Sequence, residues 1–129
     1  MDVNRPDVLS EVEAMVERYE RALVTNDIED LDSLFLNSPT TIRYGAGENL
    51  YGYDEIASFR AVRPAGDLMR TRSHSIVTTF GSDFAVAATL FTRDSAPGKL
   101  GRQSQTWVRT PDGWRVAAAH VSVINMPAD

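Results

Sequence analysis

GRQSQTWVRTPDGWRVAAAHVS, residues 101–122, decides the fold because it has the pattern of two long strands joined by a turn. The Pro-Asp-Gly turn at 111–113 suits a three-residue hairpin loop, with the glycine in the left-handed position of a bulge. That loop sets Ser104 opposite His120, whereas a two-residue loop would shift the pairing by one residue. Either loop predicts an antiparallel pair.

Alternation of side chains divides the second strand of this hairpin into two largely apolar faces. One face is expected to carry Trp114, Val116, Ala118, His120 and Ser122, and the other Arg115, Ala117, Ala119, Val121 and Val123. Because both faces are apolar, we expect helices to cover one and a second subunit to cover the other. The sequence therefore predicts a homodimer that forms through the outer face of the sheet.

The rest of the chain supplies helices and further strands around this hairpin. Strands are predicted over 69–80, 84–93, 102–110 and 114–125, joined by the turn signals GSD, DSAPGKLG and PDG. A long helix is predicted from Asp7 or Ser10 to about Thr25, because its apolar residues recur every three or four positions. Shorter helices are predicted over 28–36 and, capped by Asp54, over 54–63, with a short strand over 40–45 between them.

This order of elements indicates an α+β fold in a single domain that spans residues 1–129. A curved antiparallel sheet wrapped around the long N-terminal helix makes a cone, and the open end of a cone is a natural pocket. The chain has a net charge of −5 and no basic run, which argues against nucleic-acid binding. It has no cysteine, signal peptide or apolar run long enough for a membrane span, so we expect a cytoplasmic protein.

A charged residue interrupts the short strand, where TIRYG places Arg43 between Ile42 and Tyr44. If Ile42 faces the core, Arg43 is a solvated outward charge. If Arg43 faces the core it needs an anion, because an unpaired buried charge is very unfavourable. A substrate carboxylate would supply that anion through two parallel hydrogen bonds.

Tyr19 lies in the apolar stripe of the long helix, where the sheet is expected to cover it. It is either a core aromatic residue whose hydroxyl finds a partner, or a hydrogen-bond donor and proton-transfer group in the pocket. The two residues are linked: if Arg43 points inward, Tyr19 is its expected neighbour. A nearby positive charge makes a phenol a better proton donor.

Other polar side chains are candidates for substrate binding, namely Tyr51, Arg60, Arg63, Gln105 and His120. The two arginines either extend to water or give a second cationic contact. His120 has no Asp or Glu in its strand to orient it, so it is expected to position a substrate rather than to act as a base. The chain lacks metal-ligand spacings, a phosphate loop and a dinucleotide fingerprint, so we expect neither a metal nor a cofactor.

ENLYGYDEIASFR, RQSQTW and GWRVAAAHVS, together with VERYERAL and TIRYG, resemble the AtzH-like family, which includes the HpxZ-type proteins. The resemblance covers nearly the whole chain and implies a nuclear transport factor 2-like, or cystatin-like, fold. It places the key tyrosine of the family on Tyr19 and its key arginine on Arg43.

The resemblance also implies an activity, a decarboxylating amidohydrolase that converts 1,3-dicarboxyurea, or a similar carboxylated urea or amide, to allophanate. Such a metal-independent hydrolase would act on a C–N bond in cyanuric acid (s-triazine) catabolism, a branch of nitrogen metabolism, in association with an amidase. The alternative is a non-catalytic accessory or binding subunit of a neighbouring amidase. An isomerase or dehydratase of the same fold is less favoured, since such enzymes place an acid in the cone and only Glu48 is a loose candidate.

Overall fold

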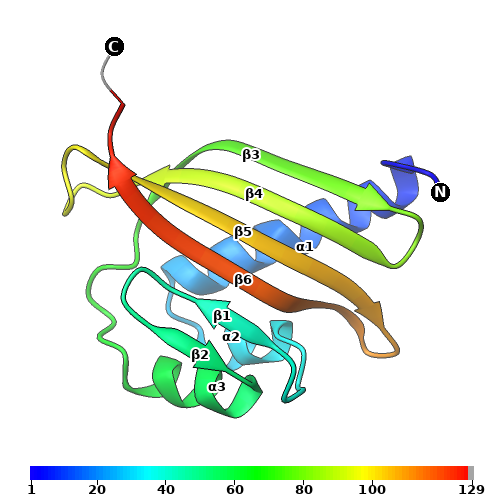
Figure 1. Ribbon diagram of the computed structural model, residues 1–129, viewed down its shortest axis with the longest axis horizontal. Helices are drawn as coiled ribbons and strands as arrows, with labels where there is room; N and C mark the ends of the chain where they lie inside the picture. Colours follow the sequence, from blue (N-terminus) through cyan, green and yellow to red (C-terminus); the bar gives the residue numbers. More distant parts are fainter. Residues whose placement is uncertain (128–129) are drawn as a thin grey trace.

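A computed structural model describes residues 1–127 and shows one curved sheet with three helices (Figure 1). The elements are α1 (Pro6–Val24), α2 (Ile28–Leu34), β1 (Ile42–Tyr44), β2 (Asn49–Tyr51), α3 (Tyr53–Val62), β3 (Thr71–Phe80), β4 (Phe84–Thr92), β5 (Lys99–Thr110) and β6 (Gly113–Asn125). The predicted α+β class and the order of elements are confirmed. The short strand β2 was not predicted.

The six strands lie in the order β2-β1-β6-β5-β4-β3, and β1 and β6 are the one parallel pair in this sheet. Figure 1 shows α1 crossing behind the long strands, with α2 and α3 beside the short ones. The core forms between the helices and the inner face of the sheet, and includes Val12, Val16, Leu31, Leu34, Phe35, Trp107 and Val116. We call the opposite, uncovered side of the sheet the outer face.

The hairpin that joins β5 to β6 corrects the expected loop length and confirms one expected pairing. Thr110 pairs with Gly113, so Pro111 and Asp112 form a two-residue loop and not the three-residue loop predicted. A bulge between Thr106 and Trp107 restores the register further along, and Ser104 does pair with His120. The predicted register at the turn is therefore wrong, and the predicted pairing at His120 is correct.

The same bulge corrects the predicted faces of β6. Val116 pairs with Trp107 and Ala118 with Thr106, which leaves Ala117 as the extra residue on β6. An extra residue reverses the inward and outward alternation beyond it. Trp114 and Val116 are buried before the bulge and Ala119 is buried after it, whereas His120 is exposed on the outer face.

Two helix starts also differ from the expected ones. Helix α1 begins at Pro6, with Arg5 as an N-cap that makes no capping hydrogen bond through its side chain, because proline favours the first turn. Helix α3 begins at Tyr53 after Gly52, whose φ of 87° suits glycine and ends the short strand β2. None of the described helices combines the length and the apolar character that a membrane crossing requires.

Gly101 of β5 leaves space for the ring of Phe91, because a Cβ at this position would overlap that ring. We predict that Gly101→Ala lowers the free energy of unfolding by about 1–3 kcal/mol, the usual range for overpacking. Urea unfolding measures this change. Gly66→Ala is the matched control, since nothing lies within 4 Å of a Cβ placed there. Equal stabilities of the two variants would contradict the packing argument.

Candidate functional site

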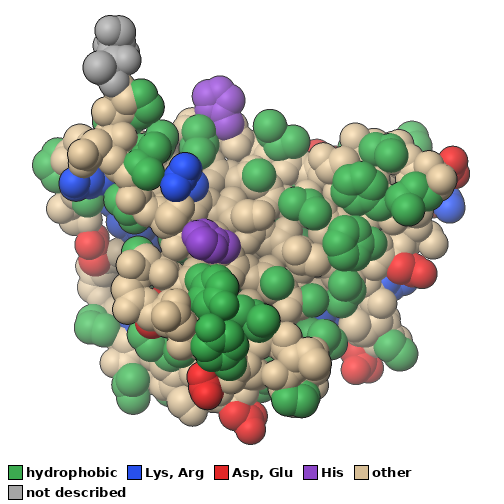
Figure 2. Space-filling model, in the orientation of Figure 1, with side chains coloured by type: hydrophobic (Ala, Val, Ile, Leu, Met, Phe, Trp, Pro, Cys, Tyr) green, Lys and Arg blue, Asp and Glu red, His purple; other side chains and the backbone are tan. Residues whose placement is uncertain are grey.

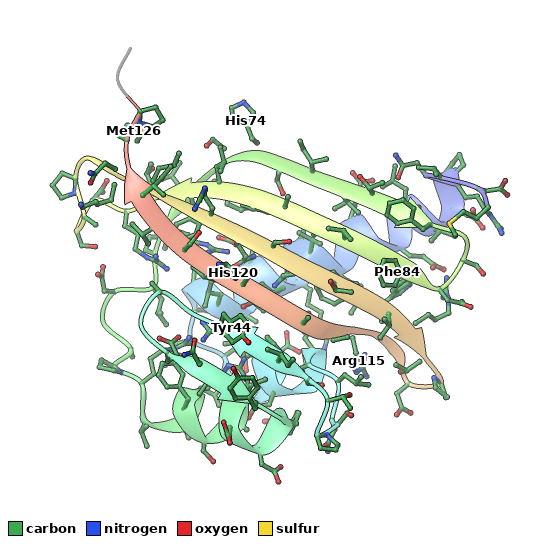
Figure 3. All side chains as sticks on the ribbon, viewed as in Figure 1. Tyr44, His74, Phe84, Arg115, His120 and Met126 are labelled. Atoms are coloured by element: carbon green, nitrogen blue, oxygen red, sulfur yellow. The ribbon has the colours of Figure 1, made fainter. Side chains whose placement is uncertain are left out.

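Arg43 points toward the helices, which decides between the two orientations left open by the sequence. It pairs in the sheet with Ala119, a core residue, and its side chain is 12% exposed. Its guanidinium carbon lies 5.7 Å from the centre of the Phe59 ring of α3. The next residue, Tyr44, faces the other way, and its ring centroid lies 6.1 Å from that of His120 on the outer face (Figure 3).

A tight turn brings Glu48 back onto Arg43. The amide of Gly45 donates a hydrogen bond to the carbonyl of Glu48 at 2.9 Å, which closes the turn between β1 and β2. Nη1 of Arg43 then donates to Oε1 of Glu48 at 2.7 Å. In the described structure, a carboxylate of the protein therefore lies where the sequence predicts a substrate carboxylate.

Arg63, at the end of α3, lacks such a partner. Its Nε and Nη2 atoms are buried and make no hydrogen bond within residues 1–127. Burial lowers the pKa of Arg63, and the neighbouring charges of Arg60 and Arg43 lower it further, while Tyr19 and Glu48 act in the opposite direction. Buried N–H donors that make no hydrogen bond favour a bound anion, because burying a cation without a counter-charge is costly.

Arg60 already has an ion-pair partner within the protein. Its side chain is only 4% exposed, it forms an ion pair with Asp32 of α2, and it lies over the ring of Phe35 at 4.8 Å. The sequence offered Arg60 and Arg63 as equal candidates for a second cationic contact. Of these two, the structure leaves Arg63 as the arginine with unpaired donors, because Asp32 of α2 pairs with Arg60.

Tyr19 and Gln105 complete the inward-facing group. Tyr19 is buried in α1, with its ring 6.2 Å from that of Phe35. Gln105 pairs with Ala119 across the sheet, so it lies in the same transverse row as Arg43. Its Oε1 accepts a hydrogen bond from the indole of Trp107 at 3.1 Å, but its buried Nε2 has no partner within residues 1–127.

We call Tyr19, Arg43, Glu48, Arg63 and Gln105 the inner cluster. Its members come from α1, β1, the β1–β2 turn, the end of α3 and β5. The cluster presents unpaired N–H donors on Arg63 and Gln105 beside a phenol and an arginine that holds one carboxylate. Such a set of groups can bind a small anion through hydrogen bonds and can donate a proton to it.

Two predicted site residues lie elsewhere. Tyr51 is 53% exposed, and its hydroxyl lies 3.0 Å from that of Tyr44 on the outer face. His120 is exposed on that same face, because the bulge reverses the alternation of β6. The structure does not bring these two side chains together with Tyr19 and Arg43. The alternation in β1 could have shown that Tyr44, the neighbour of Tyr51, faces the opposite side from Arg43. No sequence signal marked the bulge in β6 that moves His120.

The outer face carries a shallow depression of about 560 Å³, lined in part by His74, Ile76, Arg102, Ser104, His120 and Ser122. Figure 2 shows this face from the front, with the two histidines and a basic side chain between them. Ile76, Ala88 and Leu90 give this depression an apolar part, and the exposed ring of Phe84 lies further along the same face (Figure 3). Dimerisation through this face stays a prediction.

A second group of charges lies on the inner face toward β3. Arg70 donates to Glu20 of α1 and to Gln103 of β5, and its guanidinium carbon lies 4.4 Å from the centre of the Phe91 ring. This ion pair was not predicted. Glu20 is buried because the curved sheet reaches around α1.

Comparison with known proteins gives the family. Residues 1–127 match the AtzH-like family. No curated protein matches the chain significantly.

Solved structures agree with this match. A protein of unknown function from the DUF3225 family of Pectobacterium atrosepticum is 53% identical, covers 96% of each chain and has a TM-score of 0.94. A cystatin-like fold protein from Burkholderia xenovorans is 48% identical, covers 98% of this chain and 99% of its own, and also has a TM-score of 0.94. An NTF2-like protein of unknown function from Pseudomonas putida shares the fold at 16% identity, with 88% and 84% of the two chains covered and a TM-score of 0.71. The chain is thus a member of the AtzH-like family and has the nuclear transport factor 2-like, cystatin-like fold that its sequence predicted.

Proposed function

We propose that this protein is a metal-independent, decarboxylating amidohydrolase that acts on a small carboxylated urea or amide, with 1,3-dicarboxyurea as the first candidate and allophanate as the product. The observation that carries the proposal is the inner cluster. It combines an inward-facing arginine, a second arginine with buried unpaired donors, and a buried tyrosine. Membership of the AtzH-like family supports the choice of substrate class.

The balanced reaction breaks a single C–N bond. 1,3-Dicarboxyurea differs from allophanate by one CO2, so the bond between a nitrogen and its terminal carboxylate breaks, and that nitrogen takes up a proton. The carboxylate leaves as CO2, or as bicarbonate when water attacks it. Ammonia is not a product of this step and forms only when allophanate is hydrolysed afterwards.

The residues of the inner cluster suit the two ends of such a substrate. Arg43 and Arg63 would bind its two carboxylates, which matches a dianion with two cations. The unpaired amide of Gln105 would donate to the urea oxygen. Tyr19 would supply the proton to the nitrogen as the C–N bond breaks, which is the step that a general acid assists.

Turnover by the purified protein tests the proposal. 1,3-Dicarboxyurea is generated enzymically, and allophanate formation is followed by coupling to an allophanate-hydrolysing enzyme that releases ammonia. Because N-carboxylates lose CO2 without help, the rate is compared with a reaction that lacks the protein. No acceleration by the protein alone, but acceleration when a partner amidase is present, would favour the accessory subunit instead.

Tyr19→Phe isolates the role of the phenol. We predict that this variant folds normally and loses about tenfold in kcat, because one proton-donating contact of roughly 1.4 kcal/mol is removed from the transition state. Steady-state kinetics with the same coupled assay measure the loss. Tyr53→Phe, which removes a hydroxyl that donates to the carbonyl of Asp32 outside the inner cluster, is the control. A wild-type kcat in Tyr19→Phe would remove the phenol from the mechanism.

A further inference from the structure

We infer that Glu48 occupies, in the empty protein, the place that a substrate carboxylate takes on Arg43, and that binding exchanges one carboxylate for the other. Glu48 thereby sets the affinity of the site for carboxylates. The inference rests on the proposed function only in taking Arg43 as an anion-binding residue. It assigns to Glu48 a role in specificity that neither the family match nor the fold implies.

The turn between β1 and β2 presents the Glu48 carboxylate to Arg43. The Glu48 carboxylate accepts from Nη1 of Arg43 through Oε1 and from the amide of Gly47 through Oε2 at 3.2 Å. It is 24% exposed, whereas Arg43 is 12% exposed. The carboxylate therefore lies at the solvent side of the pair, at the end of a flexible side chain, and it can leave while Arg43 stays in place.

The balance of charge in the inner cluster also favours displacement of Glu48. Asp32 neutralises Arg60, so Glu48 is the carboxylate that remains for Arg43 and Arg63 within the inner cluster. A dianion that bound beside Glu48 would bring three negative charges against two positive ones. Displacement of Glu48 into solvent instead leaves two charges of each sign, which is the favoured arrangement because like charges repel strongly at close range.

Gly45 leaves room for the Glu48 side chain. A Cβ on this residue would overlap the carboxylate of Glu48, so the glycine leaves the space through which that side chain reaches Arg43. Gly47 sits in the same turn, and a Cβ there would meet nothing within 4 Å. Neither glycine has a positive φ, so alanine fits the backbone at both positions. We therefore expect Gly45→Ala to move the Glu48 carboxylate away from Arg43, and Gly47→Ala to serve as a matched control that leaves it in place.

The test is calorimetric titration of the full chain with malonate, a small dicarboxylate. We expect Glu48→Gln and Gly45→Ala to bind malonate at least about fivefold more tightly than the wild type, because the competing carboxylate is gone or displaced. Gly47→Ala should bind as the wild type does, and Arg43→Ala should bind much more weakly. Thermal unfolding checks that each variant is folded.

The outcomes separate this inference from the proposed function. Unchanged or weaker malonate binding in both Glu48→Gln and Gly45→Ala, with binding still dependent on Arg43, would overturn the exchange and leave the anion site standing. Tighter binding in Glu48→Gln alone would also overturn it, since the gain would then come from removing a negative charge and not from freeing the place on Arg43. Malonate binding that does not depend on Arg43, or no binding to any variant, would contradict both.

Discussion

Arg43→Ala should lower kcat/KM for 1,3-dicarboxyurea by more than about a hundredfold, since two charge-assisted hydrogen bonds of roughly 1.5–3 kcal/mol each are lost and about 1.4 kcal/mol corresponds to tenfold. The position explains the size of the effect. Arg43 faces the core side of the sheet, 12% exposed, with Arg63 as the nearby arginine whose buried donors are unpaired. No other described side chain of the inner cluster can replace its cation at this place in β1.

Two further variants show whether the loss of kcat/KM depends on the planar pair of donors and whether it is specific to Arg43. Arg43→Lys keeps the charge but not the planar pair of donors, so it should recover only a small part of the activity. Arg102→Ala removes an exposed arginine from the outer face and should change kcat/KM less than twofold, by about the effect of a neutral surface substitution. A kcat/KM of Arg43→Ala within threefold of the wild type would show that this arginine takes no part in the reaction.

Glu20→Ala should lower the free energy of unfolding by about 3–5 kcal/mol, the usual effect of removing one partner from a buried ion pair. Arg70, the remaining partner, has a side chain that is 1% exposed and donates to both carboxylate oxygens of Glu20. Without Glu20 it keeps a bond to Gln103 and its contact with the Phe91 ring, but no counter-charge. Urea unfolding followed by circular dichroism measures the change.

The same helix supplies the control. Glu17 pairs with Arg72, but the Glu17 side chain is 60% exposed, so Glu17→Ala should change the free energy of unfolding by no more than about 1 kcal/mol. The comparison holds the helix and the type of substitution constant, while burial and the number of arginine contacts differ, since Glu20 also lies 3.9 Å from Nε of Arg72. Similar losses in the two variants would show that burial does not determine the strength of these pairs.

Local sequence patterns were enough to predict the architecture, whereas the choice of Tyr19 and Arg43 as the central residues of the site came from the resemblance to the family. The periodicity of α1 placed Tyr19 in the buried stripe, and the turn signals placed the long strands in order. Burial of Arg43 was one of two readings, because alternation shows that Ile42 and Arg43 face opposite sides but not which side is the core. The parallel pairing of β1 with β6 settles this by putting Arg43 beside the buried Ala119.

The residues that the sequence misplaced depend on contacts between distant segments. His120 left the predicted site because one extra residue, Ala117, reverses the faces of β6 beyond the bulge. Arg60 differs from Arg63 only because α2 brings Asp32 next to it, 28 residues earlier in the chain. Glu48 meets Arg43 because Gly45, which has no Cβ, leaves space for the Glu48 carboxylate. None of these events leaves a periodic signal in the sequence.

The unpaired donors of Arg63 also bear on how long each copy of the protein lasts in the cell. A partly buried cation whose donors are unpaired makes the fold without a bound anion less stable than it would be with an apolar side chain there. An anion that neutralises it stabilises the folded chain by mass action, in proportion to the logarithm of its concentration above the dissociation constant. Proteases act on the opened chain, so scarcity of the metabolite would shorten the lifetime of the protein and its supply would lengthen it.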